Sequence, residues 1–410
     1  MKELIVLPGR VDSSFFLNEL GILTKEFDRV IILSYPVSKE KIVDIEKEYG
    51  VVCHIVDSKK VSIKLISGLF RWLKNAEVKQ EIKEYFSLSF KGITRVAYIL
   101  FYGVFALQTY WKIEDEIKKT EDKTEITLYS YWLSRPAYAA AYFADKNSDL
   151  IKKTITRAHR YDLYEYRNSL AYLPFRKYID KNLDKIFFIS KDGLNYYQNW
   201  REKLSEKKDW ADLTVNYLGT YNRGHLQKQM KKKNGIVLAS CSSVIPVKRL
   251  DLIIGLLEQI RDIRIKWIHI GNGELFEQIR DEAKRRLSHM EILFSGKVDN
   301  GDVLKIYQKE DVDYFINLSD SEGIPVSIME AISMGIPVIA RNVGGIREIV
   351  NEWNGCLLEQ TDGLEKVKDF LRLRVEKQEE YEVYSKYARR FWEQKFNGDR
   401  NYSQFMKEII

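Results

Sequence analysis

The sequence predicts an α/β protein of two doubly wound domains, each with a parallel sheet. Short apolar runs alternate with amphipathic stretches along the chain, which is the pattern of repeated strand–helix–strand units. The runs are apolar throughout, as expected for strands that helices cover on both faces. At 410 residues the chain exceeds the roughly 250–300 residues that one hydrophobic core serves, so we expect two domains.

After residue 235 the alternation is regular enough to place each element. Predicted strands lie at 236–242, 265–271, 292–296, 312–319 and 337–341, and predicted helices lie at 248–260, 274–286, 301–309, 326–334 and 346–350. Helices at this spacing join neighbouring parallel strands by right-handed crossovers. We therefore expect one parallel sheet with helices on both faces.

The first half follows the same pattern less regularly. Predicted strands lie at 4–8, 29–35, 51–56, 126–132, 153–159 and 185–190. The segment 214–234 carries two Gly and several Lys without apolar periodicity, so we place the domain boundary there. We expect a first domain at 1–220 and a second at 221–385. The final segment, 386–410, is expected to form a helix that packs back on the first domain.

Composition excludes several classes of protein. Hydrophobic residues make up 45% of the chain and charged residues 30%, which excludes a disordered chain. The 66 Lys and Arg against 59 Asp and Glu give a charge of +7, but the basic residues match no nucleic-acid-binding motif, so no nucleic-acid partner is expected. Three Cys without a CxxC pair indicate a reducing compartment. Residues 1–9 resemble a strand and not a signal peptide, which predicts a cytoplasmic protein.

Residues 96–111 form an uncharged apolar run that allows two interpretations. The run has 16 residues, where a spanning helix needs about 20, and Arg95 and Lys112 close it. One interpretation is a buried helix of the first domain. The other is an interfacial helix on a bilayer, which the mixture of basic and aromatic residues in 66–74 and 84–95 favours. Peripheral contact with the inner face of the cell membrane is therefore expected.

The most informative segment is 319–350, SDSEGIPVSIMEAISMGIPVIARNVGGIREIV. It places Glu322 in the loop after a predicted strand, Pro325 at the first turn of the next helix, and Glu330 within that helix. The free N–H groups and the dipole of such a helix N-terminus can hold a diphosphate. The two carboxylates can accept hydrogen bonds from the hydroxyls of a ribose and a hexose. As a bare pair they are also compatible with ordinary surface or capping carboxylates.

The sequence carries further motifs beside this segment. They are VIPVKRLDLII (244–254), IHIGNGEL (268–275), GIPVIA (335–340) followed by Gly344-Gly345, SSFFLNEL (13–20), YSYW (129–132) and TRAHRYDLYEYR (156–167). With these motifs the sequence resembles the glycosyltransferases of family 4, in particular the bacterial members that build surface polysaccharides such as capsule and exopolysaccharide. The resemblance implies the GT-B fold, in which two Rossmann-like domains face each other across a crevice and a C-terminal helix returns to the first domain.

The resemblance also implies a reaction and its substrates. The reaction would be a retaining hexosyl transfer that needs no metal ion. The donor would be a nucleotide-diphosphate sugar, with a UDP-sugar favoured. The acceptor would be a glycan or a lipid-linked oligosaccharide.

Particular residues receive roles from the same resemblance. Lys248 would neutralise the leaving diphosphate, Glu322 would hold a hydroxyl of the donor sugar, and His159 would lie near the reacting carbon. These three form the predicted catalytic set, and Glu330 would bind the ribose. The predicted donor-binding set is Lys248, Arg249, Gly271, Asn272, Gly323, Ile324, Pro325, Val326, Ser327 and Glu330. The predicted acceptor-binding set is Ser13, Ser14, Arg157 and Asp162.

Two positions depart from the family pattern. Ser243 stands five positions before Lys248, where the family usually has Arg, and Pro325 stands where a glycine is common. Asp311 and Asp313 form an Asp-Val-Asp sequence, which we interpret as the start of a strand and not as a metal motif, so no metal is expected. Two alternatives stay open. One is a sugar-nucleotide 2-epimerase of the same fold, and the other is a non-catalytic partner of an active transferase, which the missing arginine motivates.

Overall fold

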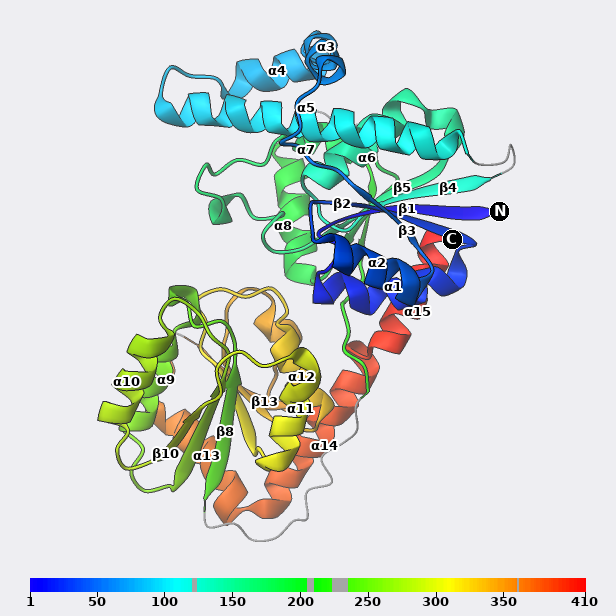
Figure 1. Cartoon of the computed structure of the whole chain (residues 1–410). Coiled ribbons are helices and arrows are strands. Elements are labelled where there is room, and N and C mark those ends of the chain that lie inside the picture. The colour runs from blue at the N-terminus through cyan, green and yellow to red at the C-terminus, as the bar shows by residue number, and fades with distance from the viewer. Residues whose placement is uncertain (120–123, 205–209, 223–234, 360) are drawn as a thin grey trace. The chain divides into compact units, whose positions relative to one another are not determined.

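The chain divides into two units, which are described separately (Figure 1). The computed structural model describes residues 1–410 except 120–123, 205–209, 223–234 and 360, and the side chains of Ser14, Phe15, Asn300 and Leu364 also fall outside the described part. Unit 1 comprises Met1–Asn216 together with Tyr402–Ile410, and unit 2 comprises Tyr217–Asn401. The structural boundary thus lies a few residues before the predicted one at 220.

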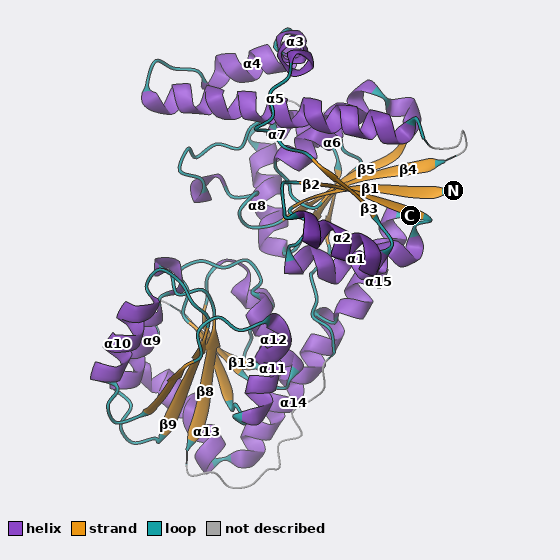
Figure 2. Cartoon of the chain, viewed as in Figure 1, coloured by secondary structure: helices purple, strands orange, loops and turns teal. Residues whose placement is uncertain are grey.

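Unit 1 is built on a seven-stranded parallel sheet with the order β3-β2-β1-β4-β5-β6-β7 (Figure 2). Its strands are β1 (Lys2–Gly9), β2 (Arg29–Ser34), β3 (Val52–Ile55), β4 (Glu125–Ser130), β5 (Ile151–Ala158), β6 (Lys185–Phe188) and β7 (Asp212–Val215). Its α-helices are α1 (Ser14–Glu26), α2 (Lys39–Tyr49), α3 (Ile63–Trp72), α4 (Ala76–Tyr85), α5 (Phe90–Ile117), α6 (Arg135–Lys146), α7 (Arg176–Lys181), α8 (Lys191–Glu202) and most of α15 (Gly398–Ile409). The six predicted strands are confirmed. The prediction missed β7 because this short edge strand has no apolar run.

Unit 2 is built on a six-stranded parallel sheet with the order β10-β9-β8-β11-β12-β13. Its strands are β8 (Ile236–Cys241), β9 (Ile265–Ile270), β10 (Glu291–Phe294), β11 (Tyr314–Asn317), β12 (Val338–Arg341) and β13 (Gly355–Leu358). Its α-helices are α9 (Leu250–Glu258), α10 (Phe276–Arg286), α11 (Asn300–Lys309), α12 (Val326–Ser333), α13 (Leu364–Glu376) and α14 (Gln378–Lys395). The five predicted strands are confirmed, and the prediction missed β13. The helix predicted at 346–350 is instead a 3₁₀ turn, Gly344–Glu348, which is too short to propagate as an α-helix.

Strand β1 shows why the apolar runs predicted the parallel sheets. All residues of Leu4–Leu7 are fully buried. Ile5 and Leu7 belong to the hydrophobic cluster on one face of the sheet, and Leu4 and Val6 belong to the cluster on the other face. Because successive side chains of a strand point to opposite faces, a strand covered on both sides needs apolar residues at every position.

Helix α5 is the long apolar helix of unit 1. Within the described residues it is the one helix whose length and composition would allow it to cross a membrane, and 39% of its most apolar window is buried. Ile99, Tyr102 and Phe105 pack into the core of unit 1. Gly103 lies so close to the Trp72 ring of α3 that a Cβ at this position would be 2.7 Å from it. The middle of α5 is therefore a core element, as the first interpretation of 96–111 expected.

The C-terminal segment differs from the predicted returning helix at 386–410. Helix α14 belongs to unit 2, where the buried Trp392 donates a hydrogen bond from Nε1 to Thr220 Oγ1 (2.8 Å). The chain then bends at Asn397, which forms a parallel backbone bridge with Thr220. Only 402–410 belong to unit 1, because the packing of α14 ties the preceding residues to unit 2.

Asp313 ties together three elements at the centre of unit 2. Its Oδ2 accepts a hydrogen bond from the N–H of Val237 (2.9 Å), and its Oδ1 accepts one from Nε of Arg374 on α13 (2.8 Å). Both charged side chains are fully buried. A carboxylate removed from water in this way depends on its cation, so the pair fastens α13 to the sheet.

We predict that Arg374→Met lowers the free energy of unfolding of unit 2 by about 3–5 kcal/mol, because Asp313 keeps a buried charge without its partner. Urea denaturation measures the loss. Arg372→Met is the matched control, since its ion pair with Asp262 (2.7 Å) is partly exposed and contributes at most about 1 kcal/mol. Equal losses in the two variants would contradict this account of Asp313.

Candidate functional site

The candidate site lies where the loops after β8 and β11 leave the sheet of unit 2. Strand β8 lies between β9, the next strand along the chain, and β11, so the direction of the strand order reverses between β8 and β11. Ligands of doubly wound sheets bind outside the carboxyl ends of the strands at such a switch point. The loop after β8 carries Lys248 and the loop after β11 carries Glu322. The fold thus brings together two of the three predicted catalytic residues.

Lys248 and Glu322 form an ion pair across this switch point. Lys248 Nζ donates to Glu322 Oε1 at 2.6 Å, and Asn317 Nδ2 at the end of β11 lies 3.4 Å from the same oxygen. The Glu322 side chain is 7% exposed and that of Lys248 is 22% exposed. A nearly buried carboxylate needs a cation, whereas the better exposed ammonium can approach an incoming anion.

Glu330 lies on α12, close to the end of β8. Burial first, and the Glu330 carboxylate second, raise the pKa of the Cys241 thiol to about 12, while Lys248 opposes the shift. Cys241 is the last residue of β8. Charges shift a pKa only from nearby. Because both side chains act on the Cys241 thiol, Glu330 and Lys248 lie at the same end of the sheet.

Helix α12 begins at this end of the sheet. Pro325 is its N-cap residue, and Val326 and Ser327 are its first residues, so their N–H groups have no partner within the helix. Ile324 is buried just before the helix. The carbonyl oxygen of Gly323 lies against Gly345, where a Cβ would be 2.7 Å from it. The predicted donor-binding residues 323–327 therefore lead into the helix and form its first positions.

Glycines in left-handed backbone conformations hold the surrounding loops. Gly344 has φ 53°, and a Cβ at this position would overlap the carbonyl oxygen of Glu322. Gly271 has φ 140°, and a Cβ there would overlap the carbonyl oxygen of Ser242. Only glycine allows these approaches without strain. The carbonyl of the exposed Asn272 also accepts a hydrogen bond from the N–H of Val244 (3.1 Å), so the predicted loop at 271–272 braces the loop that carries Lys248.

Arg249 does not replace the arginine that is missing at Ser243. Its guanidinium donates to Asp251 (2.9 Å from Nη2 to Oδ2) and to Asp320 (3.0 Å from Nη1 to Oδ1). Asp320 also pairs with Arg341 at 2.6 Å. The charge of Arg249 is engaged by two carboxylates that hold the start of α9, and its predicted donor-binding role stays a prediction.

In unit 1, His159 follows β5 and lies between aromatic rings. Its ring centroid is 4.4 Å from that of Trp132 and 4.9 Å from that of Tyr131, and the residue is 8% exposed. Asp162 accepts hydrogen bonds from the N–H groups of His159 (2.7 Å) and Leu133 (2.6 Å). Because both carboxylate oxygens of Asp162 fix backbone, its predicted role in acceptor binding is corrected to a structural one.

Arg157 is also placed differently from the prediction. Its side chain is fully buried, donating from Nε to Tyr129 Oη (3.1 Å) and from Nη1 to Asn216 Oδ1 (2.9 Å). Its Nη2 lies 3.4 Å from Glu19 Oε2, and its guanidinium lies over the Phe405 ring of α15 at 4.3 Å. An acceptor has no access to a cation enclosed in this way, so Arg157 fastens the C-terminal segment to unit 1.

The remaining predicted acceptor contacts lie just after β1. Ser13 is the N-cap of α1, and its N–H donates to the carbonyl of Arg10 (3.3 Å). The side chain of Ser14 lies outside the described part. As to metals, the described residues contain no group of three or more His, Cys, Asp or Glu arranged to hold an ion.

Comparisons with known proteins give a family match for part of the chain and a fold for the whole of it. Residues 223–391 match the family described as glycosyl transferases group 1. The structure is similar to that of Anabaena Alr3699/HepE in complex with UDP, with a TM-score of 0.69 and 14% identity over 100% of this chain and 99% of that one. It is also similar to the apo form of the lipopolysaccharide outer core galactosyltransferase WaaB, with a TM-score of 0.68 and 13% identity over the full length of both chains. The fold is GT-B.

Sequence relatives of the chain include proteins named as glycosyltransferases. The chain is 30% identical over 210 residues to an uncharacterized glycosyltransferase of Methanocaldococcus jannaschii. The aligned region covers 51% of this chain and 54% of that protein. The chain is 38% identical over 94 residues to the O-antigen biosynthesis glycosyltransferase WbnH of Escherichia coli, which covers 23% of this chain and 25% of that protein. The chain thus spans about half the length, or less, of these curated relatives.

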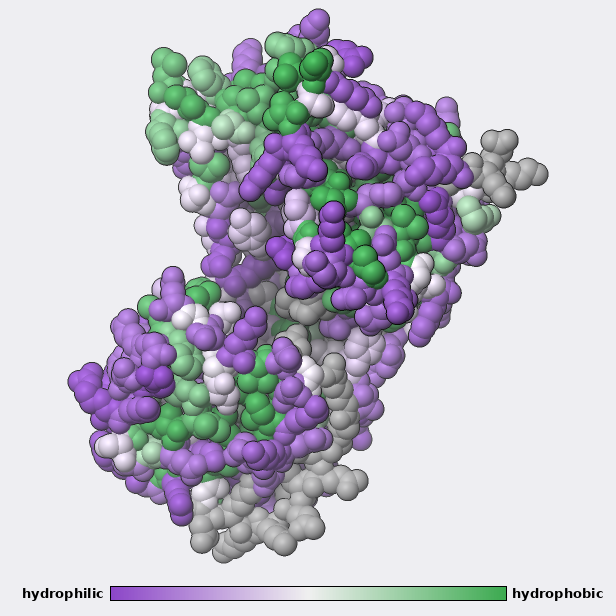
Figure 3. Space-filling view, viewed as in Figure 1, coloured by the Kyte–Doolittle hydropathy of each residue, from purple (hydrophilic) through white to green (hydrophobic). Residues whose placement is uncertain are grey.

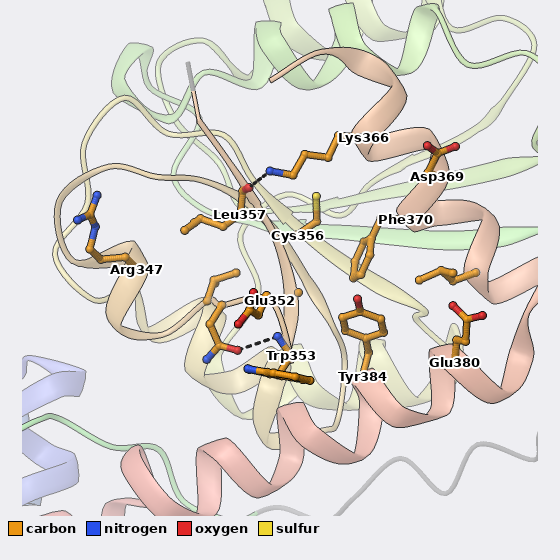
Figure 4. Close-up of a pocket in the computed structure, with 14 residues that line it drawn as sticks. Arg347, Glu352, Trp353, Cys356, Leu357, Lys366, Asp369, Phe370, Glu380 and Tyr384 are labelled. Atoms are coloured by element: carbon orange, nitrogen blue, oxygen red, sulfur yellow. Dashed lines mark hydrogen bonds between the residues drawn. The ribbon is translucent and has the colours of Figure 1, made fainter. Parts of the chain in front are cut away.

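A cavity of about 860 Å³ lies elsewhere in unit 2, between β13, α13 and α14 (Figure 4). Phe370 and Tyr384 project into it, and Lys366 at its edge donates to the carbonyl of Leu357 (2.7 Å). None of the predicted site residues lines this cavity. The candidate site at the switch point is therefore separate from this cavity.

Sequence reasoning missed two polar residues near the candidate site. Asn317 ends β11 and orients Glu322, and His269 on β9 is fully buried with Nδ1 2.9 Å from Ser240 Oγ. Burial lowers the pKa of His269 to about 4. The available signal was a polar residue inside or at the end of an otherwise apolar strand.

We predict that Gly344→Ala lowers the free energy of unfolding of unit 2 by about 1–3 kcal/mol or more, because alanine is strained at φ 53° and its Cβ overlaps the Glu322 carbonyl. Gly363→Ala is the control, since no atom lies within 4 Å of a Cβ there. Urea denaturation of both variants measures the difference. A Gly344→Ala variant as stable as the control would show that the loop relaxes without cost.

We predict a second, pH-dependent effect at His269. Its pKa is about 4 when folded against about 6.5 when unfolded, so the unfolded chain takes up a proton first as the pH falls. Stability is lost as the pH falls from about 6.5 to about 4, by up to about 3 kcal/mol, and this group causes no further loss below that range. Urea denaturation at several pH values should show a shallower loss in His269→Gln than in wild type. Parallel curves would refute the assignment.

Proposed function

We propose that the protein is a retaining glycosyltransferase of family 4 that transfers a hexose from a UDP-sugar to a lipid-linked glycan in the synthesis of a bacterial surface polysaccharide. The observation that carries the proposal is the ion pair between Lys248 and Glu322 across the switch point. Helix α12 begins beside this pair and carries Glu330. A cation, a helix N-terminus and two carboxylates are the groups that a diphosphate joined to two sugars requires.

The donor would bind through charge and backbone groups of unit 2. Lys248 contacts the diphosphate, and the N–H groups of Val326 and Ser327 at the start of α12 add donors. Pro325 contributes no N–H and stiffens the turn. Glu330, beside the end of β8, accepts hydrogen bonds from the ribose hydroxyls. The UDP named for the HepE complexes supports the choice of nucleotide.

The chemistry needs stabilisation of the charge that develops on the leaving diphosphate. The Lys248 ammonium supplies it, since a fixed cation stabilises such a transition state. In the free protein this ammonium contacts Glu322. When the donor binds, the Lys248 ammonium contacts the diphosphate in place of Glu322, and Glu322 accepts a hydrogen bond from the sugar.

The family mechanism supplies the remaining steps of the proposal. The acceptor attacks the face of the sugar that the diphosphate leaves, and the leaving phosphate oxygen takes the acceptor proton. No metal ion is assigned a step. His159 and Ser13 remain proposed contacts of unit 1 with the reacting sugar and the acceptor.

The setting of the reaction is proposed from the relatives. Some of them are named for O-antigen biosynthesis, and one neighbouring structure is a lipopolysaccharide galactosyltransferase. A lipid-linked acceptor places the protein on the cytoplasmic side of the cell membrane, in peripheral contact with it. Capsule or exopolysaccharide is the product proposed for this chain.

Two other functions would use the same fold. A non-catalytic partner subunit is favoured by one observation: Ser243 leaves out a cation, and Arg249 is held by Asp251 and Asp320. A sugar-nucleotide 2-epimerase would convert the donor with no acceptor present. Calorimetry with UDP-, GDP- and ADP-sugars separates these functions. A partner subunit binds none of the three, and an epimerase converts one of them into an isomer when no acceptor is present.

We predict that Lys248→Ala and Glu330→Ala each lower the rate of sugar transfer by about 10²–10³-fold, because each removes a group that contacts the diphosphate or the ribose. The release of UDP in the presence of a lipid-linked acceptor measures the rate. Lys305→Ala, which removes an exposed lysine of α11, is the matched control and should keep the wild-type rate. Wild-type rates in both site variants would refute the assignment.

A further inference from the structure

Unit 1 exposes large apolar side chains in one region of its sequence. Among the described residues, ten of these exposed side chains lie within 61–101, about a tenth of the chain. They are Val61, Ile63, Ile66, Phe70, Phe86, Leu88, Phe90, Ile93, Leu100 and Phe101, and together they are called the apolar surface. Figure 3 shows apolar side chains gathered over α3 and over the end of α5 next to α4. A concentration of this kind marks an interaction site.

Helix α3 is apolar on the side that faces solvent as well as on the side that faces the core. Leu65 and Trp72 are buried against unit 1. Ile63, Ile66 and Phe70, spaced by three and four residues, share the opposite side and are exposed. Lys64, Ser67 and Arg71 form a separate polar strip of the helix, so the outward apolar side of α3 is neither polar nor covered in the described structure.

The loop between α4 and α5 forms a preformed apolar tip. Phe86, Leu88 and Phe90 alternate with two serines, and Leu88 and Phe90 are 88% exposed. Ser87 Oγ and Ser89 Oγ are hydrogen-bonded at 2.7 Å, and Ser89 Oγ also accepts a backbone N–H from the first turn of α5 (3.1 Å). The serines satisfy polar groups inside the turn, so the turn presents its apolar side chains outward.

Basic residues outnumber acidic ones around this surface, and the acidic ones lie on α4, which carries Glu77, Glu81 and Glu84 beside Lys79 and Lys83. The segments 58–75 and 85–113 contain five and three Lys or Arg, respectively, and no Asp or Glu. Lys64, Arg71 and Lys91 are exposed among the apolar side chains. Apolar side chains that enter the acyl region, with cations at the level of the phosphates, are the pattern of a helix lying on an anionic bilayer.

We propose that the apolar surface docks on an anionic lipid bilayer, with Leu88 and Phe90 entering the acyl region and Arg71 and Lys91 contacting lipid phosphates. This inference rests on the membrane contact of the proposed function and not on the transfer reaction. The contact is peripheral, because the middle of α5 is buried in the core of unit 1 and so is not free to span a membrane.

Sedimentation with vesicles tests the docking. We expect the full chain to bind vesicles of phosphatidylcholine containing about a third of phosphatidylglycerol, and to bind phosphatidylcholine alone at least about tenfold more weakly. High salt should weaken the binding to the anionic vesicles, because it screens the contacts to the phosphates. Binding to neither kind of vesicle would overturn the proposal.

Variants of the tip test which residues carry the binding. L88S combined with F90S should lower vesicle binding by at least about tenfold, because both side chains lose apolar area buried in lipid. L293S combined with V383S is the matched control, since both residues are exposed on unit 2. Thermal unfolding checks that each variant keeps its fold. Equal binding by the tip variant and the control would contradict the assignment of the tip.

Charge variants test the choice of an anionic partner. R71Q combined with K91Q should lower binding to the anionic vesicles by about thirtyfold, which is the effect of two charges near such a surface. K305Q combined with K386Q removes the same charge from exposed positions of unit 2 and should leave the binding unchanged. Equal losses would mean that net charge, and not this surface, drives the binding.

Two further measurements separate this proposal from others. Self-association that L88S with F90S abolishes in analytical ultracentrifugation, without vesicle binding, would assign the surface to a second copy of the chain and overturn the proposal. UDP affinity, measured by calorimetry, should be equal in the wild type and the tip variant. A protein that binds vesicles but no UDP refutes the proposed transfer and leaves the docking standing, and the reverse result refutes the docking alone.

Discussion

The ion pair between Lys248 and Glu322 is the interaction on which the candidate site depends. Glu322 is nearly buried, so its carboxylate needs a cation, and the loop after β8 supplies one at 2.6 Å. The contact exists only because β8 and β11 are neighbours at the switch point of the sheet, although their loops are more than seventy residues apart in the chain. Without a ligand the two charges satisfy each other, and this poises Lys248 to exchange a carboxylate for a diphosphate. The site is therefore arranged before the donor arrives.

Strand β11 connects this site to the stability of unit 2. Before the strand begins, Asp313 binds the backbone of β8 and the guanidinium of Arg374. At the other end, Asn317 holds Glu322. The buried pair at one end keeps β11 in register with β8, and that register places the two loops of the site side by side. The tightly held strand thus serves both the fold and the chemistry, as expected when a site is built on rigid elements.

The strands were predictable wherever a run of apolar residues marked them. The edge strands β7 (DLTV) and β13 (GCLL) were not, since polar residues alternate with apolar ones in the first and a glycine opens the second. The candidate site was predictable in unit 2, where Lys248 and Glu322 lie in the loops after strands and Glu330 lies on the helix that follows the second loop. In unit 1, Arg157 and Asp162 were grouped with His159 because they are close in sequence. Arg157 lies within β5, enclosed against the Phe405 ring of α15, whereas His159 lies just past the end of the strand, beside Trp132.

By itself the sequence determined two parallel-sheet domains and the order of the groups at the switch point, because apolar periodicity and the residues after each strand are local properties. Tertiary structure alone decided which charges remain available. Arg249 and Lys248 are adjacent in the chain, yet one is held by two aspartates and the other meets Glu322. Tertiary structure also decided that the outward side of α3 stays uncovered. Burial and ion pairing depend on residues that are distant in sequence, and no local pattern records which of them come together.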